Sequence, residues 1–215
     1  MNFITERKLL VEHLKKTGVL KTKKVISAFM KIKRENFVSK ELKQKAYYDT
    51  PLPILFGQTI SQPTTIAIMT EELDVQKDDI VLEVGAGSGY QAAILSKLAK
   101  KVYSVERAIE LCKIAVDNIK KEKIKNVEII LSDGTLGYKE KAPYDRIIST
   151  AYSTEIPPPL LSQLKPGGIL IIPIGDYSGQ NMIKVKKLKN GKIEKINLGR
   201  FAFVPLIGKY GADFR

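Results

Sequence analysis

A glycine turn directly after an apolar run carries the residues best suited to bind a ligand. Residues 80–90, IVLEVGAGSGY, place Gly85, Gly87 and Gly89 in the spacing G-x-G-x-G. Because glycine lacks a β-carbon, such a turn lets the backbone approach a ligand closely. Glu83 would repel the diphosphate of a dinucleotide, whose fingerprint is instead G-x-G-x-x-G. A carboxylate there suits the amino group and sulfonium of S-adenosylmethionine, so the pattern predicts a site for that cofactor.

Two more acidic residues follow neighbouring strand-like segments. Residues 101–105 end at Glu106, whose carboxylate could accept hydrogen bonds from both hydroxyls of a ribose. The next such segment is followed by Asp133 and Gly134, which could accept from an adenine amino group and offer backbone to the ring, respectively. Singly, each acid is typical of a solvated strand end. Because the carboxyl ends of parallel strands meet at one edge of a sheet, we expect all three carboxylates to meet one cofactor.

The elements that must position these residues alternate between strand-like and helical patterns. The strand-like segments are 79–84, 101–106, 127–131, 144–149 and 168–174. This alternation predicts an α/β fold with a doubly wound, mainly parallel sheet of the Rossmann-like kind.

The two ends of the chain differ from this core. Residues 1–46 have helical periodicity with a break at Gly18, so we expect N-terminal helices. Residues 182–188 and 193–198 flank Asn190-Gly191 and predict a β-hairpin, and 201–207 is a candidate for a last antiparallel strand. We expect a single domain over 1–215, made of N-terminal helices and an active-site loop (1–76), a cofactor-binding core (77–180) and C-terminal strands (181–215).

The active-site loop contains a segment that fits neither a helix nor a regular strand. Residues 47–63, YYDTPLPILFGQTISQP, lack periodicity and are interrupted by proline and glycine, which is typical of an ordered loop. A helical pattern follows at 64–73. Ser61 therefore has two interpretations: its hydroxyl caps that helix, or it lies over the cofactor.

Composition excludes several classes of protein. Hydrophobic residues are 44% of the 215, and no apolar run approaches the about 20 residues that span a bilayer. Residues 1–16 are charged throughout, so we expect no signal peptide and no membrane partner. The single cysteine, Cys112, suits a buried position in a reducing cytoplasm. The single histidine, His13, suits a helix surface, and we expect no metal site.

The net charge of +13 raises the question of nucleic acid. Lysines are spread from Lys8 to Lys209 and often alternate with glutamate, as in KKEKIK and KNGKIEK. This distribution is typical of the solvated surface of a thermophile's protein rather than of a binding patch. We therefore expect a cytoplasmic monomer without a nucleic-acid partner.

Several motifs together resemble one family over nearly the whole chain, the protein-L-isoaspartate O-methyltransferases. They are KRENFV (33–38), YYDTPLPI (47–54), GQTISQP (57–63), LEVGAGSGYQAA (82–93), VYSVER (102–107), SDGTLG (132–137), APYDRIIST (142–150), EIPPPLLSQLKPGG (155–168) and FVPL (203–206). The glycine motif alone marks only a methyltransferase, whereas GQTISQP and FVPL are specific to this family.

The resemblance implies a repair enzyme that methylates the free α-carboxylate of isoaspartyl residues in damaged proteins, leaving S-adenosylhomocysteine. It implies that Ser61 is catalytic. The cofactor-binding residues would be Ile60, Glu83, Gly85, Gly87, Gly89, Glu106, Asp133 and Gly134. The apolar residues that would form the substrate pocket are Pro53, Ile54, Val204 and Leu206. Two residues beside this pocket depart from the family pattern, Leu55 at a common glycine and Ala202 at a common arginine.

Two alternatives remain at the level of sequence. The positive charge would suit methylation of RNA, but the region after the fourth strand, STAYSTEIPPPL, lacks the Asn/Asp-Pro-Pro-aromatic motif of base-amino methyltransferases. Cys112 lies in a helical pattern rather than at a site for cytosine-carbon chemistry. The other alternative is a non-catalytic binding protein that keeps the fold, which an intact Ser61 loop argues against.

Overall fold

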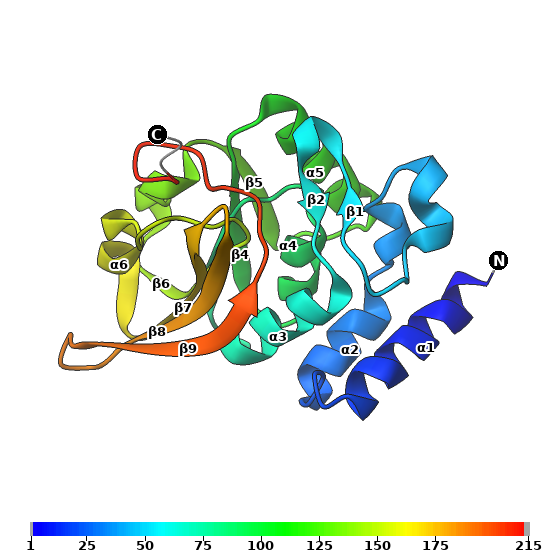
Figure 1. Cartoon of the computed structure of the whole chain (residues 1–215), viewed down its shortest axis with the longest axis horizontal. Helices are drawn as coiled ribbons and strands as arrows, with labels where there is room; N and C mark the ends of the chain where they lie inside the picture. Colours follow the sequence, from blue (N-terminus) through cyan, green and yellow to red (C-terminus); the bar gives the residue numbers. More distant parts are fainter. Residues whose placement is uncertain (1, 213–215) are drawn as a thin grey trace.

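A seven-stranded sheet forms the centre of the computed structural model, which describes residues 2–212 (Figure 1). Its strands are β3 (Ile80–Val84), β4 (Lys101–Glu106), β5 (Val127–Leu131), β6 (Tyr144–Ser149), β7 (Leu164–Asp176), β8 (Gly179–Lys187) and β9 (Ile193–Phe201). Their order is β5-β4-β3-β6-β7-β8-β9. The first five run parallel, and β8 and β9 are antiparallel. The predicted fold class is confirmed.

The order of the strands reverses beside β3, and this reversal determines where a ligand can bind. The chain passes from β3 to β4 and β5 on one side, then returns to place β6 on the other side of β3. In open α/β sheets ligands bind at such a switch point, beyond the carboxyl ends of the strands. The glycine turn after β3 lies there.

Helices cover both faces of the sheet. Their bounds are α1 (Phe3–Lys16), α2 (Lys23–Lys31), α3 (Pro63–Leu73), α4 (Tyr90–Leu95), α5 (Ile109–Lys121) and α6 (Pro158–Gln163). Val81 of β3 belongs to the apolar cluster that includes Leu14 of α1 and Phe29 of α2. Leu82 faces the opposite way, into the cluster that contains Leu160 of α6. A strand covered on both faces has the near-continuous apolar run that the sequence shows.

The N-terminal helices and the β8–β9 hairpin agree with the sequence. In Figure 1, α1 and α2 lie side by side at the N-terminal edge of the molecule. The first cluster runs from Leu10 in α1 to Met182 in β8, so the ends of the chain share a core. The hairpin pairs Lys187 with Ile193 next to its turn.

The segment 47–63 differs from the predicted loop. It forms a small antiparallel hairpin in which Leu52 pairs with Ile60 and Pro53 with Thr59. These strands, β1 (Leu52–Pro53) and β2 (Thr59–Ile60), have two residues each. Two residues are too few to produce an alternating pattern, so the prediction of a segment without regular strands was wrong.

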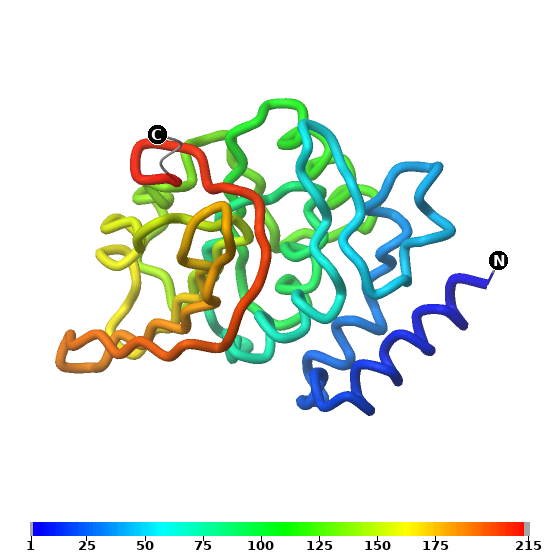
Figure 2. Tube along the Cα trace, viewed as in Figure 1, coloured from blue at the N-terminus to red at the C-terminus, as the bar shows by residue number. Residues whose placement is uncertain are grey.

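The predicted last strand over 201–207 is also wrong. The chain leaves β9 at Phe201, runs upward past the β1–β2 hairpin and then turns away from it (Figure 2). Its hydrogen bonds go to the segment after β6: Tyr152 N donates to Val204 O at 2.9 Å, and Leu206 N donates to Tyr152 O at 2.7 Å. These bonds place Val204 to Leu206 over the carboxyl edge of the parallel strands rather than along the sheet.

Candidate active site

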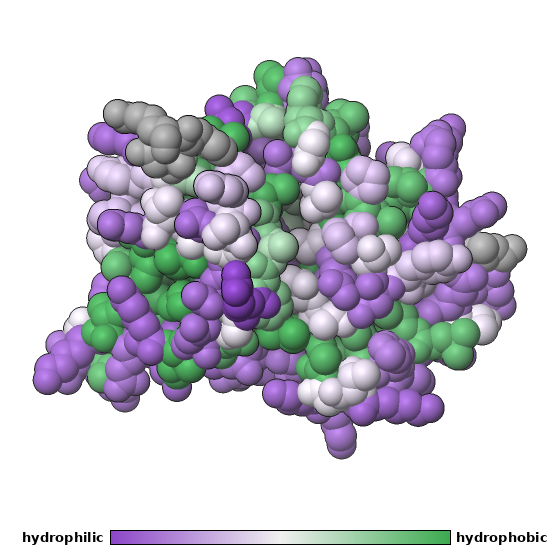
Figure 3. Space-filling model, in the orientation of Figure 1, coloured by the Kyte–Doolittle hydropathy of each residue, from purple (hydrophilic) through white to green (hydrophobic). Residues whose placement is uncertain are grey.

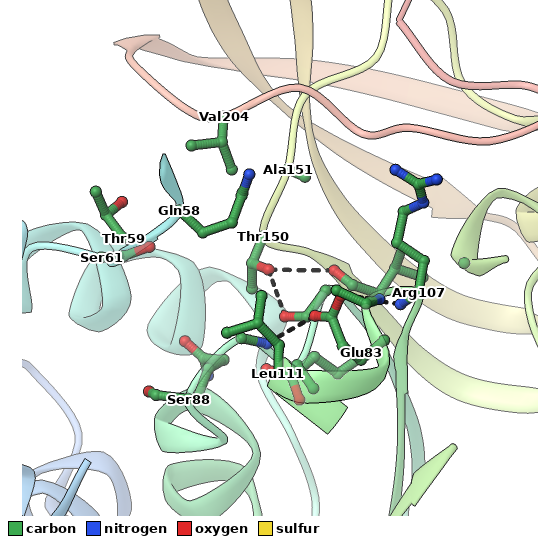
Figure 4. Close-up of a pocket in the computed structure, with 18 of the residues that line it drawn as sticks. Gln58, Thr59, Ser61, Glu83, Ser88, Arg107, Leu111, Thr150, Ala151 and Val204 are labelled. Atoms are coloured by element: carbon green, nitrogen blue, oxygen red, sulfur yellow. Dashed lines mark hydrogen bonds between the residues drawn. The ribbon is translucent and has the colours of Figure 1, made fainter. Parts of the chain in front are cut away.

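A cavity of about 390 Å³, here called the inner cavity, lies beyond the carboxyl ends of β3 and β4 (Figure 4). Four stretches of chain contribute most of its lining. They are 58–61 of the small hairpin, 83–88 of the glycine turn, 105–108 after β4 and 204–207 after β9. Thr150 and Ala151, which follow β6, are also part of the wall. Elements far apart in sequence therefore meet at the switch point.

The glycine turn has a backbone that other residues adopt with difficulty. Gly85 has φ +93°, and a β-carbon there would lie 2.5 Å from Thr150 Oγ1. That hydroxyl donates to Gly85 O at 2.7 Å. Gly87 also lines the inner cavity. Gly89 does not, and it instead lets the backbone approach Ala115 of α5, which a β-carbon would meet at 3.4 Å.

Glu83 lines the inner cavity, and only one of its two carboxylate oxygens accepts a hydrogen bond within residues 2–212. The residue is 0% exposed. Ser104 Oγ donates to Oε2 at 2.5 Å, whereas Oε1 has no partner among the described residues. Burial raises the pKa of this carboxyl to about 8. A buried oxygen without a partner suits a ligand that brings a hydrogen-bond donor and a positive charge, as S-adenosylmethionine does.

Glu106 also lines the inner cavity, and hydrogen bonds fix its orientation. Its Oε2 accepts from Gly87 N at 3.0 Å. Its Oε1 accepts from the backbone N–H groups of Arg107 and Ala108 at 2.9 and 3.0 Å. Backbone donors on both oxygens hold the carboxylate against the glycine turn, which is the position predicted for a contact with ribose.

Asp133 is placed differently from the prediction. Gly134 lines the inner cavity but Asp133 does not. Asp133 Oδ1 accepts from Thr135 N and Oγ1 at 2.9 and 2.7 Å, so it caps the short turn of residues 134–136. Asp133 Oδ2 accepts from Lys209 N at 2.9 Å. The carboxylate is therefore used by local structure and by the C-terminal segment.

Ser61 does not cap the helix that follows it. Helix α3 begins at Pro63, its N-cap residue is Gln62, and that residue makes no side-chain cap bond. The donors at this end are satisfied by Asp49, which accepts from Thr64 N at 2.8 Å and from Thr64 Oγ1 at 2.6 Å. The capping interpretation of Ser61 is wrong, and the residue lines the inner cavity together with Ile60.

A second space, here called the outer hollow, adjoins the inner cavity. It measures about 520 Å³ and lies between the small hairpin and the segment after β9. Four residues line both spaces: Thr59, Ser61, Thr150 and Val204. The face of the molecule seen in Figure 3 is hollowed near its centre, and its hydrophilic residues are spread around it rather than gathered in one patch.

The predicted substrate residues divide into two groups. Val204 and Leu206 line the inner cavity, but Pro53 and Ile54 line neither space. Pro53 is exposed and pairs with Thr59 in the hairpin. Ile54 packs against the first apolar cluster, behind the glycine turn.

The hairpin offers other residues to the site, which the sequence analysis missed. Phe56, Gln58 and Thr59 line the inner cavity, as does Thr150. Thr150 directly follows β6, so the rule that found Glu106 at a strand end could have found it. The hairpin residues carried no comparable signal.

Other kinds of site have less support in the described part of the chain. Within residues 2–212 no group of three or more His, Cys, Asp or Glu is placed to hold a metal ion. Cys112 is buried and free. No helix in the same range has the length and apolar character needed to cross a membrane.

Comparison with known proteins identifies the family. The sequence model of the protein-L-isoaspartate(D-aspartate) O-methyltransferases matches residues 5–211. The chain belongs to this family. A protein-L-isoaspartate O-methyltransferase of Dictyoglomus turgidum is 51% identical over 206 residues, which are 96% of this chain and 93% of that protein. One from Pyrococcus horikoshii is 49% identical over 203 residues, covering 94% and 92%.

Solved structures of the family agree with the fold. A protein-L-isoaspartate O-methyltransferase structure aligns with TM-score 0.87 at 33% identity, covering 95% of this chain and 67% of that one. A Plasmodium falciparum protein described as a member of the same family, in complex with S-adenosyl-L-homocysteine, aligns with TM-score 0.83 at 30% identity, covering 94% and 98%. The family resemblance drawn from the sequence motifs is confirmed.

Proposed function

We propose that this protein transfers a methyl group from S-adenosylmethionine to the free α-carboxylate of L-isoaspartyl residues in damaged proteins and peptides. One observation carries the proposal beyond family membership. Ser61, which Figure 4 labels among the residues of the inner cavity, also lines the outer hollow, so its hydroxyl would lie where a cofactor in one space meets a peptide in the other.

The residues of the inner cavity fit the cofactor. When bound, S-adenosylmethionine supplies a methyl group on a positively charged sulfur, whose C–S bond breaks as an acceptor oxygen forms the new C–O bond. The Glu83 carboxylate would balance the positive charge of the cofactor, and Gly85 and Gly87 would bring backbone close to it.

Other residues would bind the nucleoside part of the cofactor. Glu106 would accept hydrogen bonds from the ribose hydroxyls. Gly134 would lie beside the adenine ring, and Ile60 would contribute an apolar contact. Asp133 would contribute only indirectly, by holding the turn that contains Gly134.

The acceptor needs orientation rather than activation. A carboxyl group with a reference pKa near ~4 is ionised at neutral pH, so no general base is required. Ser61 would donate a hydrogen bond that directs the carboxylate toward the methyl group, a bond worth roughly 1.5 to 3 kcal/mol. Val204 and Leu206 would exclude water. Well-oriented proximity can contribute about 7 to 11 kcal/mol to such a reaction.

The remaining features of the proposal concern the whole chain. The apolar cluster shared between α1 and β8 supports one domain over 1–215 rather than separate units. A single buried cysteine supports a reducing, cytoplasmic setting. We infer a monomer, and light scattering during size-exclusion chromatography would test it.

The deciding experiment compares three acceptors for labelled methyl from S-adenosylmethionine. They are an isoaspartyl peptide, the same peptide with normal aspartate, and bulk RNA. We expect base-labile label on the isoaspartyl peptide alone. Label on RNA alone would overturn the proposal, and no label on any acceptor would favour a binding protein that keeps the fold.

The role of Ser61 is tested by Ser61→Ala. We expect kcat/KM for the isoaspartyl peptide to fall about 10- to 100-fold, because a hydrogen bond to a charged acceptor is lost. Cofactor affinity, measured by calorimetry, should change little. The matched control is Ser162→Ala on the exposed surface of α6, which should keep full activity. An unchanged rate in Ser61→Ala would remove Ser61 from the reaction.

A further inference from the structure

The outer hollow has one cationic side chain at its rim. Of the described residues that line this space, Arg200 alone carries a charge. Arg200 is exposed and forms no ion pair within residues 2–212. Every other residue of the lining has an aliphatic, aromatic, hydroxyl or amide side chain. An anionic group on a ligand in this space would therefore meet one oppositely charged side chain, Arg200.

Arg200 is held by strand structure rather than by a loop. It lies one residue before the end of β9 and pairs with Asn181 of β8. Its guanidinium extends over the bare backbone of Gly179, where a β-carbon would lie 2.8 Å from Arg200 Nη2. Asp176, which pairs with Gly179 in the β7–β8 hairpin, forms no ion pair with Arg200, and its Oδ1 accepts instead from Ser178 N and Oγ at 2.8 and 2.6 Å. A guanidinium on a strand without an ion-pair partner is suited to bind a carboxylate.

The carboxylate that Arg200 binds is not the one that is methylated. The acceptor carboxylate loses its negative charge as it becomes an ester, so a cation against it would stabilise the reactant more than the transition state. Arg200 does not line the inner cavity, where the methyl group is transferred, whereas Ser61 lines both spaces. The cation is therefore placed for another part of the peptide.

We propose that Arg200 is a specificity-determining residue that favours isoaspartyl peptides carrying a second carboxylate, on an acidic side chain close to the damaged residue. This inference rests on the proposed function. It names a sequence preference within that substrate class. The contact is exposed to solvent, so its effect on affinity is modest, about three- to five-fold, and it weakens as salt rises.

The test measures peptide binding directly and then turnover. Fluorescent isoaspartyl peptides carry one glutamate at a defined distance from the damaged residue, or glutamine in its place. Binding is followed by fluorescence polarisation with saturating S-adenosylhomocysteine, and kcat and KM are measured with S-adenosylmethionine. For wild type we expect the best glutamate peptide to bind three- to five-fold more tightly than its glutamine partner, with equal kcat.

Two variants separate a specific contact from the general attraction of a protein with net charge +13. Arg200→Gln should abolish the glutamate preference, so that the glutamate and glutamine peptides bind with equal Kd. Lys195→Gln removes the same charge from an exposed position of β9 outside the hollow, so it should keep the preference. Arg200→Lys should keep part of it.

The possible failures are distinguishable. If the preference survives in Arg200→Gln, or if Lys195→Gln removes it equally, the assignment of Arg200 is wrong while isoaspartyl methylation stands. Absence of the preference in wild type has the same meaning. If wild type neither binds nor methylates isoaspartyl peptides better than aspartyl peptides, the proposed function itself fails.

Discussion

Two regions of the molecule supply the inner cavity, and they are stabilised in different ways. The glycine-turn side is built on β3, which pairs with β4 and β6 over most of its length and has apolar cover on both faces. The Ser61 side is a hairpin with two paired residues in each strand. Backbone pairing can hold the first region in place but not the second, because isolated two-stranded hairpins are marginally stable.

The Ser61 side depends instead on buried polar contacts at its base. Arg7 of α1 donates from Nε to Tyr47 Oη at 2.8 Å and forms an ion pair with Glu35 at 3.1 Å. Tyr47 Oη in turn donates to Glu35. Burial, together with this bond to Glu35, raises the pKa of Tyr47. The chain reaches the first strand of the hairpin at Leu52, five residues after this tyrosine.

A second arginine connects the two regions. Arg34 is 0% exposed and donates from Nε to Ala46 O at 2.8 Å. Its guanidinium lies 4.9 Å from the ring centroid of Tyr90, the first residue of α4. Arg7 and Arg34 therefore both contact the segment that leads into the hairpin, and Arg34 also contacts the helix that follows the glycine turn.

The largest effect is expected from breaking the buried ion pair. Arg7→Met would leave Glu35 without its cation and should lower the free energy of unfolding by about 3 to 5 kcal/mol. Urea denaturation measures it. Lys15→Met, which removes an exposed ion pair with Glu12 on the same helix, should cost at most about 1 kcal/mol. Equal effects of the two variants would contradict the contrast between the regions.

The next effect is expected on the glycine-turn side. Gly85→Ala introduces a β-carbon at φ +93° and displaces the Thr150 hydroxyl, so cofactor affinity should fall about 100-fold. Calorimetric titration with S-adenosylhomocysteine measures it. Gly18→Ala is the control, since Gly18 also has a positive φ of +73° but lies between α1 and α2, with nothing within 4 Å of the new carbon. Cofactor affinity should be unchanged there, and a loss comparable to that of Gly85→Ala would show that the loss comes from general backbone strain rather than from the glycine turn.

A smaller effect should appear as a dependence of cofactor affinity on pH. Burial raises the pKa of Glu83 from 4.5 to about 8, so this carboxyl is mostly neutral at pH ~6.5 and mostly ionised at pH ~8.5. A positively charged cofactor favours the ionised form, and the Kd should fall about 10-fold over that interval. Glu83→Gln should bind weakly with no such slope. An affinity that decreased with pH would refute the assignment.

The same group affects stability in the opposite direction. Because the pKa of Glu83 is higher in the folded state than the unfolded value of 4.5, its contribution to stability is fully present below pH 4.5. That contribution is lost as pH rises through about 8. Cofactor-free protein should therefore become less stable over the interval in which it binds cofactor more tightly.

The smallest effect concerns the helix that follows Ser61. Asp49→Ala removes two hydrogen bonds at the start of α3 and should lower stability by about 1 kcal/mol. It should also lower kcat, because Ser61 lies next to the released helix end. Asn2→Ala at the start of α1 removes a comparable cap far from the site. It should match the loss of stability with no change in kcat, and a similar kcat for both variants would show that Asp49 does not position Ser61.

The contrast between the two regions also explains what could be predicted from the sequence. The strands around Glu83 and Glu106 were predictable because buried parallel strands have long apolar runs and end at one edge of the sheet. The orientation of Asp133 was not, because its carboxylate is engaged by Lys209, far away in sequence. Nothing in the local pattern distinguishes an acid that faces a cavity from one that caps a turn.

The hairpin illustrates the same limit. Ser61 could be singled out from the sequence, but Phe56, Gln58 and Thr59 could not. The pairing of Pro53 with Thr59 forms the hairpin that brings these three residues to the inner cavity, and the local sequence does not reveal that pairing. Likewise, 203–206 has the apolar residues of a strand, but its hydrogen bonds go to Tyr152 rather than to a neighbouring strand. Contacts between distant segments decided both outcomes.

The β8–β9 hairpin has a consequence for the maintenance of the protein itself. Its turn contains Asn190-Gly191, the kind of pair in which asparagine most readily rearranges to isoaspartate. Residues 193–199 of β9 separate this turn from Arg200, where the lining of the outer hollow begins, a span of roughly 23 Å along a paired strand. The turn cannot fold back into the site of its own molecule. An isoaspartate in this turn can be methylated only by a second molecule of the protein. Repair of the protein by its own activity is therefore a bimolecular reaction, and its rate falls as the protein is diluted.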